Sequence, residues 1–175
     1  MNLRPATPDD LEFLGTLAGD PEVEPFLAPG AGEDDALGLV LDRMTSGEEP
    51  HGLIVVESPT GRPVGALELA LISRHSRICA VRRLMVDPAS RGRGVGSTAV
   101  WLVCRQAFED HGHHRVQAEV YGDNLASQRL FERLGFIREG VRRSAYWRRD
   151  QWLDGIIFGL LAGELVAPVA DAGSA

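Results

Sequence analysis

Residues 83–100 read RLMVDPASRGRGVGSTAV, and this stretch decides the fold. The apolar run ICAVRRLMVD that leads into it is typical of a buried strand. After Gly94, apolar residues such as Val95, Ala99 and Val103 recur at helical spacing up to about Asp110. The stretch therefore predicts a strand, a glycine-rich loop and a helix in immediate succession.

This loop has the composition of an anion site. Gly92, Gly94 and Gly96 allow backbone amides to approach a bound group closely, and the following helix contributes unsatisfied N–H groups and the positive end of its dipole. Arg91 and Arg93 add charge-assisted hydrogen bonds, so phosphate oxygens are the natural ligand. No Gly-Lys-Ser/Thr follows, and GRGVG lacks the dinucleotide spacing, which disfavours nucleoside triphosphates. A tight connection without a ligand would use the same glycines.

Upstream of this stretch, the chain predicts two helices and a hairpin. Residues 3–6 favour a short strand. Thr7, Pro8 and Asp10 then provide an N-cap, a first helical position and a capping carboxylate for a helix at about 8–19. A second helix is expected at about 33–46. GLIVVE and PVGALELALI, joined by SPTGR, predict an antiparallel hairpin next to the strand ICAVRRLMVD.

Downstream, RVQAEVY alternates apolar and polar residues and predicts a strand with two different faces. A helix follows, with Asn124 as its N-cap and Gly135 at its left-handed C-terminal position. FIREGVRRSAYW and QWLDGIIFGLLAG predict two long strands joined by the polar turn RRD. The order is therefore β-α-α-β-β-β-α-β-α-β-β, an α/β domain with a mixed central sheet.

The length of 175 residues accommodates one domain with one substantial core. We assign residues 1–165 to this domain and expect residues 166–175 to form a flexible C-terminal tail. The sequence has neither a run of about 18 apolar residues nor a basic and then apolar leader, so we predict a cytoplasmic protein without a membrane span or signal peptide. Cys79 and Cys104 are expected to be buried hydrophobes rather than a disulfide or a metal site.

Charge is divided unevenly along the chain. The net charge is −7, and residues 1–60 contain thirteen Asp and Glu against two Arg, whereas the remainder contains twelve against sixteen basic residues. If the fold keeps these segments apart, one surface suits an anionic ligand and another a cationic one. Solvated acidic loops would give the same count. An acidic chain without a basic cluster does not favour nucleic-acid binding.

Two segments resemble motifs of one enzyme superfamily. RLMVDPASRGRGVGSTAV is similar to the acyl-CoA-binding motif of the GNAT superfamily, whose Arg-x-x-Gly-x-Gly pattern is matched by Arg91, Gly94 and Gly96. NLASQRLFERLGFIREG resembles the second GNAT motif and is closest to the RimJ/RimL-type ribosomal-protein N-acetyltransferases, as is the ending YWRRDQWLDGIIFGLL. The second motif is matched by Asn124, Ser127, Leu130, Glu132, Leu134, Gly135 and Phe136. The resemblance covers nearly all of residues 3–165.

This resemblance implies a GNAT fold, in which the sheet splays between its fourth and fifth strands, and acetyl-CoA as co-substrate. The CoA pyrophosphate would lie on the loop formed by Arg91, Gly92, Arg93, Gly94, Val95 and Gly96. Main-chain groups of Leu84, Met85 and Val86 would bind the pantetheine arm, and an amide N–H near Met85 would polarise the thioester carbonyl. Asn124 would face the CoA arm, and Arg129 would reach the cofactor.

The implied reaction is direct attack of a neutral amine on the thioester, for which a base is useful. Glu119, on the strand RVQAEVY, is the first candidate. Glu68 is the second, a single carboxylate in the apolar run GALELALI, where burial favours the neutral form. Each would equally serve as an edge or ion-paired carboxylate with a structural role.

Two positions depart from the common GNAT pattern. Many members carry a Glu in the strand before the phosphate loop, where this chain has Ala80 and Val81. Many also carry a Tyr in the second-motif helix, where Phe131 stands here and cannot protonate the departing thiolate. In the RimL-like branch a Ser near the helix start is the substitute, so Ser127 inherits this role. Capping of the first helical turn is its alternative role.

The resemblance implies that the N-terminal helices and the last two strands wall the acceptor site. The acidic N-terminal part predicts a cationic amine. The residues expected to attract this amine are Glu22, Glu24, Glu33, Asp34 and Asp35. The residues of the last two strands expected to line the acceptor site are Trp147, Trp152 and Asp154. A protein N-terminal α-amine is the leading acceptor. A polyamine, amino acid or aminoglycoside is the alternative, as is a non-catalytic acyl-CoA sensor. Many relatives pair through the sheet or helices, so a homodimer is left open.

Overall fold

The computed structural model describes residues 1–27 and 52–168. Its strands are β1 (Asn2–Pro5), β2 (Leu53–Glu57), β3 (Pro63–Ser73), β4 (Ile78–Val86), β5 (Arg115–Tyr121), β6 (Ile137–Arg148) and β7 (Gln151–Leu161). Its helices are α1 (Leu11–Ala18), α3 (Val95–Glu109) and α4 (Leu125–Arg133), with 3-10 turns η1 (Pro8–Asp10), η2 (Glu24–Phe26), η3 (Pro88–Ser90) and η4 (Ala162–Glu164). The helix expected at about 33–46 lies outside the described residues. None of these helices is long and apolar enough to cross a membrane.

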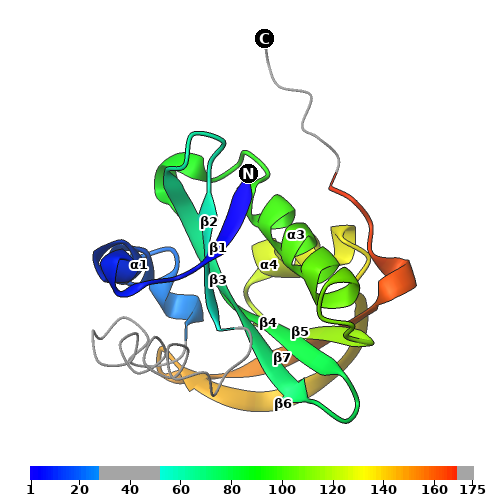
Figure 1. The fold of residues 1–175 in the computed structure, drawn as a ribbon. Helices are drawn as coiled ribbons and strands as arrows, with labels where there is room; N and C mark the ends of the chain where they lie inside the picture. The colour runs from blue at the N-terminus through cyan, green and yellow to red at the C-terminus, as the bar shows by residue number, and fades with distance from the viewer. Residues whose placement is uncertain (28–51, 169–175) are drawn as a thin grey trace.

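The seven strands form one sheet in the order β1-β2-β3-β4-β5-β7-β6. Every neighbouring pair is antiparallel except β4 and β5. In Figure 1, α1 lies on one side of the sheet, and α3 and α4 lie on the other. The predicted α/β architecture with a mixed central sheet is confirmed, and the crossover through α3 produces the parallel pair.

The parallel pair opens after three residues. Residues 78–80 of β4 pair with residues 115–117 of β5, and the last pair is Ala80 with Gln117. β4 continues to Val86 and β5 to Tyr121, so their carboxyl ends separate. The splay expected between the fourth and fifth strands is thus present, and it opens towards the glycine-rich loop that follows β4.

A β-bulge bends β4 in this opening. Ala66 of β3 pairs with Met85 and Glu68 pairs with Arg82, so β4 has one residue more than β3 between these pairs. Arg83 adopts the left-handed region there, at φ 48°, which costs a non-glycine residue about 1–2 kcal/mol. A bulge leaves main-chain groups outside the ladder. This one lies next to the segment predicted to bind pantetheine.

Two apolar clusters hold the layers together. The larger packs α3 and α4 against one face of the sheet and contains Val100, Phe131 and Phe158. The smaller packs α1 against the other face, where Leu14 and Met85 are buried. The side chain of a sheet residue therefore belongs either to the α3 face or to the α1 face, according to strand alternation.

Both cysteines lie in the larger cluster as free thiols, as predicted. Burial raises the pKa of the Cys79 thiol to about 12 and raises that of Cys104 as well. Neither thiol is therefore a nucleophile near neutral pH.

The end of α4 is closed by the C-terminal segment. Gly135 follows the helix at φ 92°, in the left-handed position predicted for it. A Cβ there would overlap the carbonyl oxygen of Glu164. The Val166 N–H donates to the Leu134 carbonyl at 3.0 Å. Close approach of another backbone, as well as the turn itself, therefore requires glycine at this position.

The N-terminal helix start is built on Asp10, as predicted. Its carboxylate accepts hydrogen bonds from the Thr7 N–H at 2.8 Å and from two nitrogens of Arg4 at 2.7 Å each. Arg4 is the main reason that the pKa of Asp10 falls to about 2, against the opposing effect of burial. The capping carboxylate thus also joins α1 to β1.

We expect acid to remove the stability that this carboxylate contributes. Because its pKa is lower in the folded chain than in the unfolded chain, the contribution is complete above about pH 4 and is lost as the pH falls towards about 2. Asp10→Asn should lower the free energy of unfolding by about 2 kcal/mol near pH ~7, and by less near pH ~3, in urea titrations. Asp9→Asn, at an exposed position, is the control. An equal cost of Asp10→Asn at both pH values would contradict this expectation.

Candidate active site

The glycine-rich loop meets α3 in a form that suits an anion. Gly92 and Gly94 adopt the left-handed region, at φ 71° and 74°, and Gly94 is the N-cap of α3. The Thr98 N–H donates to the Gly94 carbonyl at 2.9 Å and starts the helical ladder. The amides of residues 95–97 therefore have no partner within the helix, and the helix dipole adds partial positive charge. These groups fit the pyrophosphate of CoA.

Gly96 brings the loop against α4 and β4. A Cβ at this position would lie 3.2 Å from Leu130 Cδ1, 3.5 Å from Val86 Cγ2 and 3.7 Å from Leu84 Cδ2. Leu84, Val86 and Gly96, all predicted cofactor contacts, thus lie together. The Met85 side chain is buried on the α1 face instead, which leaves its main chain for the predicted role.

The two arginines of the loop have different surroundings. Arg91 donates to Asp20 and Glu22 at 2.7 Å each, and its Nε donates to the Val86 carbonyl at 3.1 Å. Arg91 therefore ties the loop to the segment after α1, and its charge is already balanced. Arg93 is exposed and forms no ion pair with residues 1–27 or 52–168. Of the two side chains, that of Arg93 is the one available to a phosphate.

This difference predicts separate effects of the two arginines. Arg93→Ala should weaken CoA binding about fivefold in calorimetric titrations and leave the melting temperature unchanged, because a charge-assisted hydrogen bond at an exposed site contributes about 1 kcal/mol. Arg91→Ala should lower the melting temperature by roughly 2–4 °C, because Asp20 and Glu22 lose their partner. If Arg91→Ala instead weakened CoA binding and left the melting temperature unchanged, Arg91 would bind the phosphate rather than Asp20 and Glu22.

The start of α4 carries three predicted site residues. Asn124 Oδ1 accepts a hydrogen bond from the Ser127 N–H at 3.0 Å, so the predicted N-cap is confirmed. The Ser127 side chain is half-buried, and its hydroxyl makes no hydrogen bond within the part of the chain that the structure describes. Arg129 is exposed. The catalytic role of Ser127 and the cofactor contact of Arg129 stay predictions.

Glu68 is buried but not isolated. Its side chain is 11% exposed, and Arg83 Nη1 donates to its Oε2 at 2.6 Å. Arg83 occupies the bulge of β4, from which its guanidinium reaches β3. Strand alternation does not reveal a bulge, so this cationic partner was not expected from the sequence. Glu68 has the surroundings of an ion-paired carboxylate, the structural alternative stated for it.

Glu119 lies on the face of the sheet opposite α3. The β5 residues on either side of it pack in the larger core cluster, while its own side chain is 32% exposed. Tyr146 Oη donates to Glu119 Oε1 at 2.7 Å, and Arg142 Nη1 lies 3.2 and 3.1 Å from the two carboxylate oxygens. Pairing with β4 ends at Gln117, two residues earlier. Glu119 therefore stands at the edge of the opening between β4 and β5.

Glycines of β7 allow side chains to meet across this strand. β7 lies between β5 and β6, and a Cβ on Gly155 would overlap Glu119 Oε1. A second ion pair, Arg115 of β5 with Glu139 of β6, crosses β7 over Gly159 in the same way. The second pair lies where β4 and β5 are still joined, so only the Glu119 cluster borders the opening.

Comparison with known proteins agrees with this geometry. The family model of the acetyltransferase (GNAT) domain matches residues 1–137. The chain belongs to the GNAT acetyltransferase family. A relative, the probable N-acetyltransferase YjcK of Bacillus subtilis, is 32% identical over 69% of this chain and 66% of its own length. The SPbeta prophage-derived uncharacterized N-acetyltransferase YokL of Bacillus subtilis is 35% identical over 46% of each chain. The GNAT chain thus spans between about half and two thirds of the length of these relatives.

Solved GNAT structures share the fold. Spermidine N-acetyltransferase from Vibrio cholerae, in complex with CoA and spermine, matches with a TM-score of 0.82 and 21% identity over 93% of this chain and 96% of that chain. A ribosomal-protein-S5-alanine acetyltransferase from Vibrio fischeri matches with a TM-score of 0.78 and 17% identity over 94% of each. The predicted GNAT fold is confirmed, and acetyl-CoA is the co-substrate of the family.

Phe131, where many GNAT members carry a Tyr, is a core residue in this chain. It is 4% exposed and meets Phe136 edge-on, with 4.9 Å between ring centroids. The Phe158 ring stacks at 6.0 Å. The GNAT site therefore has no hydroxyl at this position, as the sequence indicated.

Three segments meet at the turn of the β6–β7 hairpin. Arg149 of the turn forms an ion pair with Asp123, which precedes α4, and its guanidinium lies over the Phe26 ring of η2 at 5.7 Å. This contact joins the N-terminal segment to the carboxyl end of β5. The predicted acceptor residues of this segment are either exposed, as for Glu22 and Glu24, or outside the described residues, as for Glu33, Asp34 and Asp35.

The hairpin tryptophans lie away from the Glu119 cluster. Trp147 and Trp152 form an edge-to-face pair and are 51% and 61% exposed. Because side chains alternate along a strand, Trp147 lies on the opposite face from Tyr146, which contacts Glu119. Asp154 accepts the Ser144 N–H at 2.8 Å in a bulge of β6. The lining role of these three residues stays a prediction.

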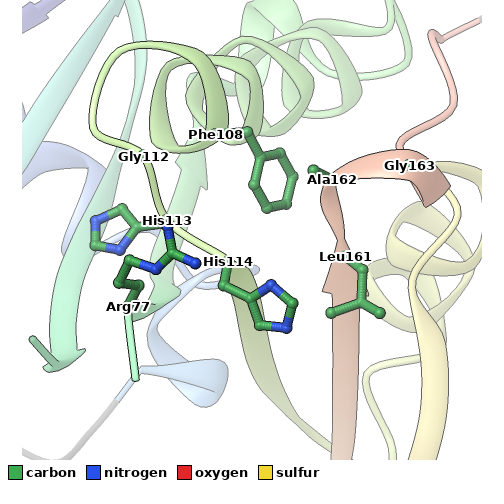
Figure 2. A pocket seen from close by; sticks show the side chains of 8 residues that line it. All are labelled: Arg77, Phe108, Gly112, His113, His114, Leu161, Ala162 and Gly163. Carbon is green, nitrogen blue, oxygen red and sulfur yellow. The ribbon is translucent and has the colours of Figure 1, made fainter. Parts of the chain in front are cut away.

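A separate hollow of about 440 Å³ lies at the far end of α3. It is lined by Phe108 of α3 and by Arg77, His113 and His114, whose side chains Figure 2 shows. The 15 residues of α3, about 22 Å in length, separate this hollow from the glycine-rich loop. The hollow is therefore not part of the acetyl-CoA site.

The sequence reasoning missed Arg83, Arg142, Tyr146 and Gly155. The bulge of β4 brings Arg83 to Glu68. The position of β7 between β5 and β6 brings Arg142 and Tyr146 to Glu119 over Gly155. One signal was present. Two glycines four residues apart in an apolar strand, at 155 and 159, indicate close approach of other groups, since glycine weakens a strand interior.

Proposed function

We propose that this GNAT chain is an acetyl-CoA-dependent N-acetyltransferase that transfers the acetyl group to a primary amine, with a protein N-terminal α-amine as its first acceptor class. The observation that carries this function is the Glu119 carboxylate, held on the α1 face at the point where β4 and β5 part. The available amides at the start of α3 support CoA binding at the other side of the same opening.

Each group in this site has a role in the proposed transfer. The amides of residues 95–97 and the Arg93 side chain bind the pyrophosphate, and the β4 main chain at residues 84–86 binds the pantetheine arm. Acetyl-CoA supplies a thioester carbonyl for attack. Glu119 accepts the proton that the amine loses as its nitrogen bonds to the carbonyl carbon. The C–S bond then breaks, and Ser127 passes a proton to the leaving thiolate and regains one from solvent, while Glu119 releases the proton that it accepted.

Charge balance favours an acceptor with one positive charge. Four arginines form ion pairs with five described carboxylates around the opening: Arg91 with Asp20 and Glu22, Arg83 with Glu68, Arg142 with Glu119, and Arg149 with Asp123. A polyamine would gain little from carboxylates that already have partners. A peptide N-terminus presents one amine and needs one acceptor carboxylate. The resemblance to RimJ/RimL-type enzymes supports the same acceptor class.

A small cationic amine is the second candidate. The fold matches that of a spermidine N-acetyltransferase as well as that of a ribosomal-protein acetyltransferase. Acidic residues at 33–35 lie outside the described residues, and they would supply negative charge that the described pairs do not.

Thiol release from acetyl-CoA distinguishes these functions. We expect peptides with free N-termini to release thiol faster than spermidine or aminoglycosides at equal concentration, and N-terminally blocked peptides to release none. Faster release with polyamines would favour the second candidate. If CoA binds in a calorimeter but no amine releases thiol, the chain is an acyl-CoA-binding sensor and the proposed function is wrong.

A further inference from the structure

We propose that Tyr146 is a positioning residue of the acetyl transfer, which holds the Glu119 carboxylate over Gly155 so that Oε2 is left to accept the proton of the amine. This inference rests on the proposed function and deepens it. Tyr146 belongs to β6, which is not a neighbour of β5 in the sheet, so its contact with Glu119 has to be built across β7.

The two carboxylate oxygens of Glu119 differ in their donors. Oε1 accepts the Tyr146 hydroxyl at 2.7 Å and lies 3.2 Å from Arg142 Nη1. Oε2 has only the Arg142 contact, at 3.1 Å, among the residues that the structure describes. A carboxylate offers about four acceptor sites. Oε2 therefore has more unoccupied acceptor sites than Oε1. Because Tyr146 donates to Oε1, it determines that Oε2 is the oxygen left for the amine proton.

Gly155 makes this arrangement possible. A Cβ at Gly155 would overlap Glu119 Oε1 and would lie 2.8 Å from Tyr146 Cε2. Any side chain on β7 at this point would therefore separate Glu119 from Tyr146. Glycine weakens the interior of a strand, so the strand itself does not favour glycine at position 155. The contact between Tyr146 and Glu119 is what requires it.

The Tyr146 ring is itself held in place. It packs against Tyr121 with 4.9 Å between ring centroids and a 58° interplanar angle. The Tyr121 hydroxyl in turn accepts hydrogen bonds from Arg148 at 2.7 and 3.1 Å. The Tyr146 ring is thus held by contacts from both β5 and β6. Such a donor restricts the Glu119 carboxylate more than the long side chain of Arg142 does.

The second crossing pair shows what a structural ion pair needs. Arg115 and Glu139 cross β7 over Gly159 with no tyrosine between them. An arginine and a carboxylate are thus sufficient to join β5 and β6 over a glycine. The tyrosine occurs only at the crossing that borders the opening between β4 and β5, where the orientation of a carboxylate matters for chemistry.

Kinetics of matched variants test this role. Tyr146→Phe should lower kcat about tenfold and leave KM for acetyl-CoA unchanged, because the Glu119 carboxylate loses the donor that orients it. Tyr121→Phe keeps the ring that packs against Tyr146 and removes only the hydroxyl that accepts from Arg148, so it should lower kcat less than Tyr146→Phe does. Gly155→Ala should also lower kcat, whereas Gly159→Ala should not. Equal effects of the two glycine variants, or a normal kcat for Tyr146→Phe, would overturn the positioning role.

A second measurement does not depend on turnover. Burial and the bond to Glu119 raise the pKa of Tyr146 to about 12. The chain contains two tyrosines, so Tyr121→Phe leaves Tyr146 as the single phenol in an absorbance titration by rapid pH jump. Adding Glu119→Gln should move this titration to lower pH. No movement would overturn the contact even if the enzyme is active, whereas movement without any thiol release would show that the contact exists and the proposed function fails.

Discussion

Glu119→Gln is expected to lower kcat by about 10²–10³-fold with the best amine acceptor, because a glutamine cannot accept the proton that the amine loses during attack. The side chain keeps its shape and can still accept the Tyr146 hydroxyl through its carbonyl oxygen. KM for acetyl-CoA should therefore stay within about twofold of the wild-type value. Initial rates of thiol release at saturating acetyl-CoA, measured across pH, give both parameters.

Glu139→Gln is the matched control for this variant. Glu139 is also a carboxylate that pairs with an arginine across β7, but it lies where β4 and β5 are still joined. We expect its loss to leave kcat unchanged and to cost only stability. If Glu139→Gln and Glu119→Gln lowered kcat to the same extent, both pairs would be structural and the base would lie elsewhere. Glu68→Gln, which leaves Arg83 without its charged partner, then becomes the next variant to measure.

The largest expected effect on stability is that of Gly135→Ala. At φ 92° an alanine is strained, and its Cβ would overlap the Glu164 carbonyl oxygen and lie 3.1 Å from the Glu164 carbonyl carbon. Relief requires the segment at 164–166 to move away from α4, which breaks the hydrogen bond from Val166 to Leu134. We expect the free energy of unfolding to fall by about 3 kcal/mol in urea titrations.

Variants of two other glycines distinguish backbone strain from the overlap with Glu164 as causes of this loss of stability. Gly61 has φ 79° with nothing near its Cβ position, so Gly61→Ala reports backbone strain alone and should cost about 1 kcal/mol. Gly140 has neither a positive φ nor a near neighbour, so Gly140→Ala should cost close to nothing. If Gly135→Ala lowered the free energy of unfolding by no more than Gly61→Ala does, the segment at 164–166 would move away from α4 without loss of stability.

The elements that could be predicted are those with local causes. The capping box at Thr7 and Asp10, the N-cap at Asn124 and the left-handed Gly135 each depend on residues within a few positions of one another, and all three are present. The splay between β4 and β5 was expected from the GNAT resemblance and not from the residues themselves. The bulge at Arg83 was not expected, because it leaves no mark in the alternation of apolar side chains.

By itself, the sequence determined the order of the seven described strands and of α1, α3 and α4, the glycine-rich loop before α3 and the GNAT family, because spacing and motif residues lie within short segments. Only the tertiary structure decided which charges are already paired. Arg91 meets Glu22 across 69 positions, Arg83 meets Glu68 across 15, and Tyr146 meets Glu119 across 27. Such partners depend on sheet order, on a bulge and on the space above a glycine, which are properties of packed strands rather than of any one segment.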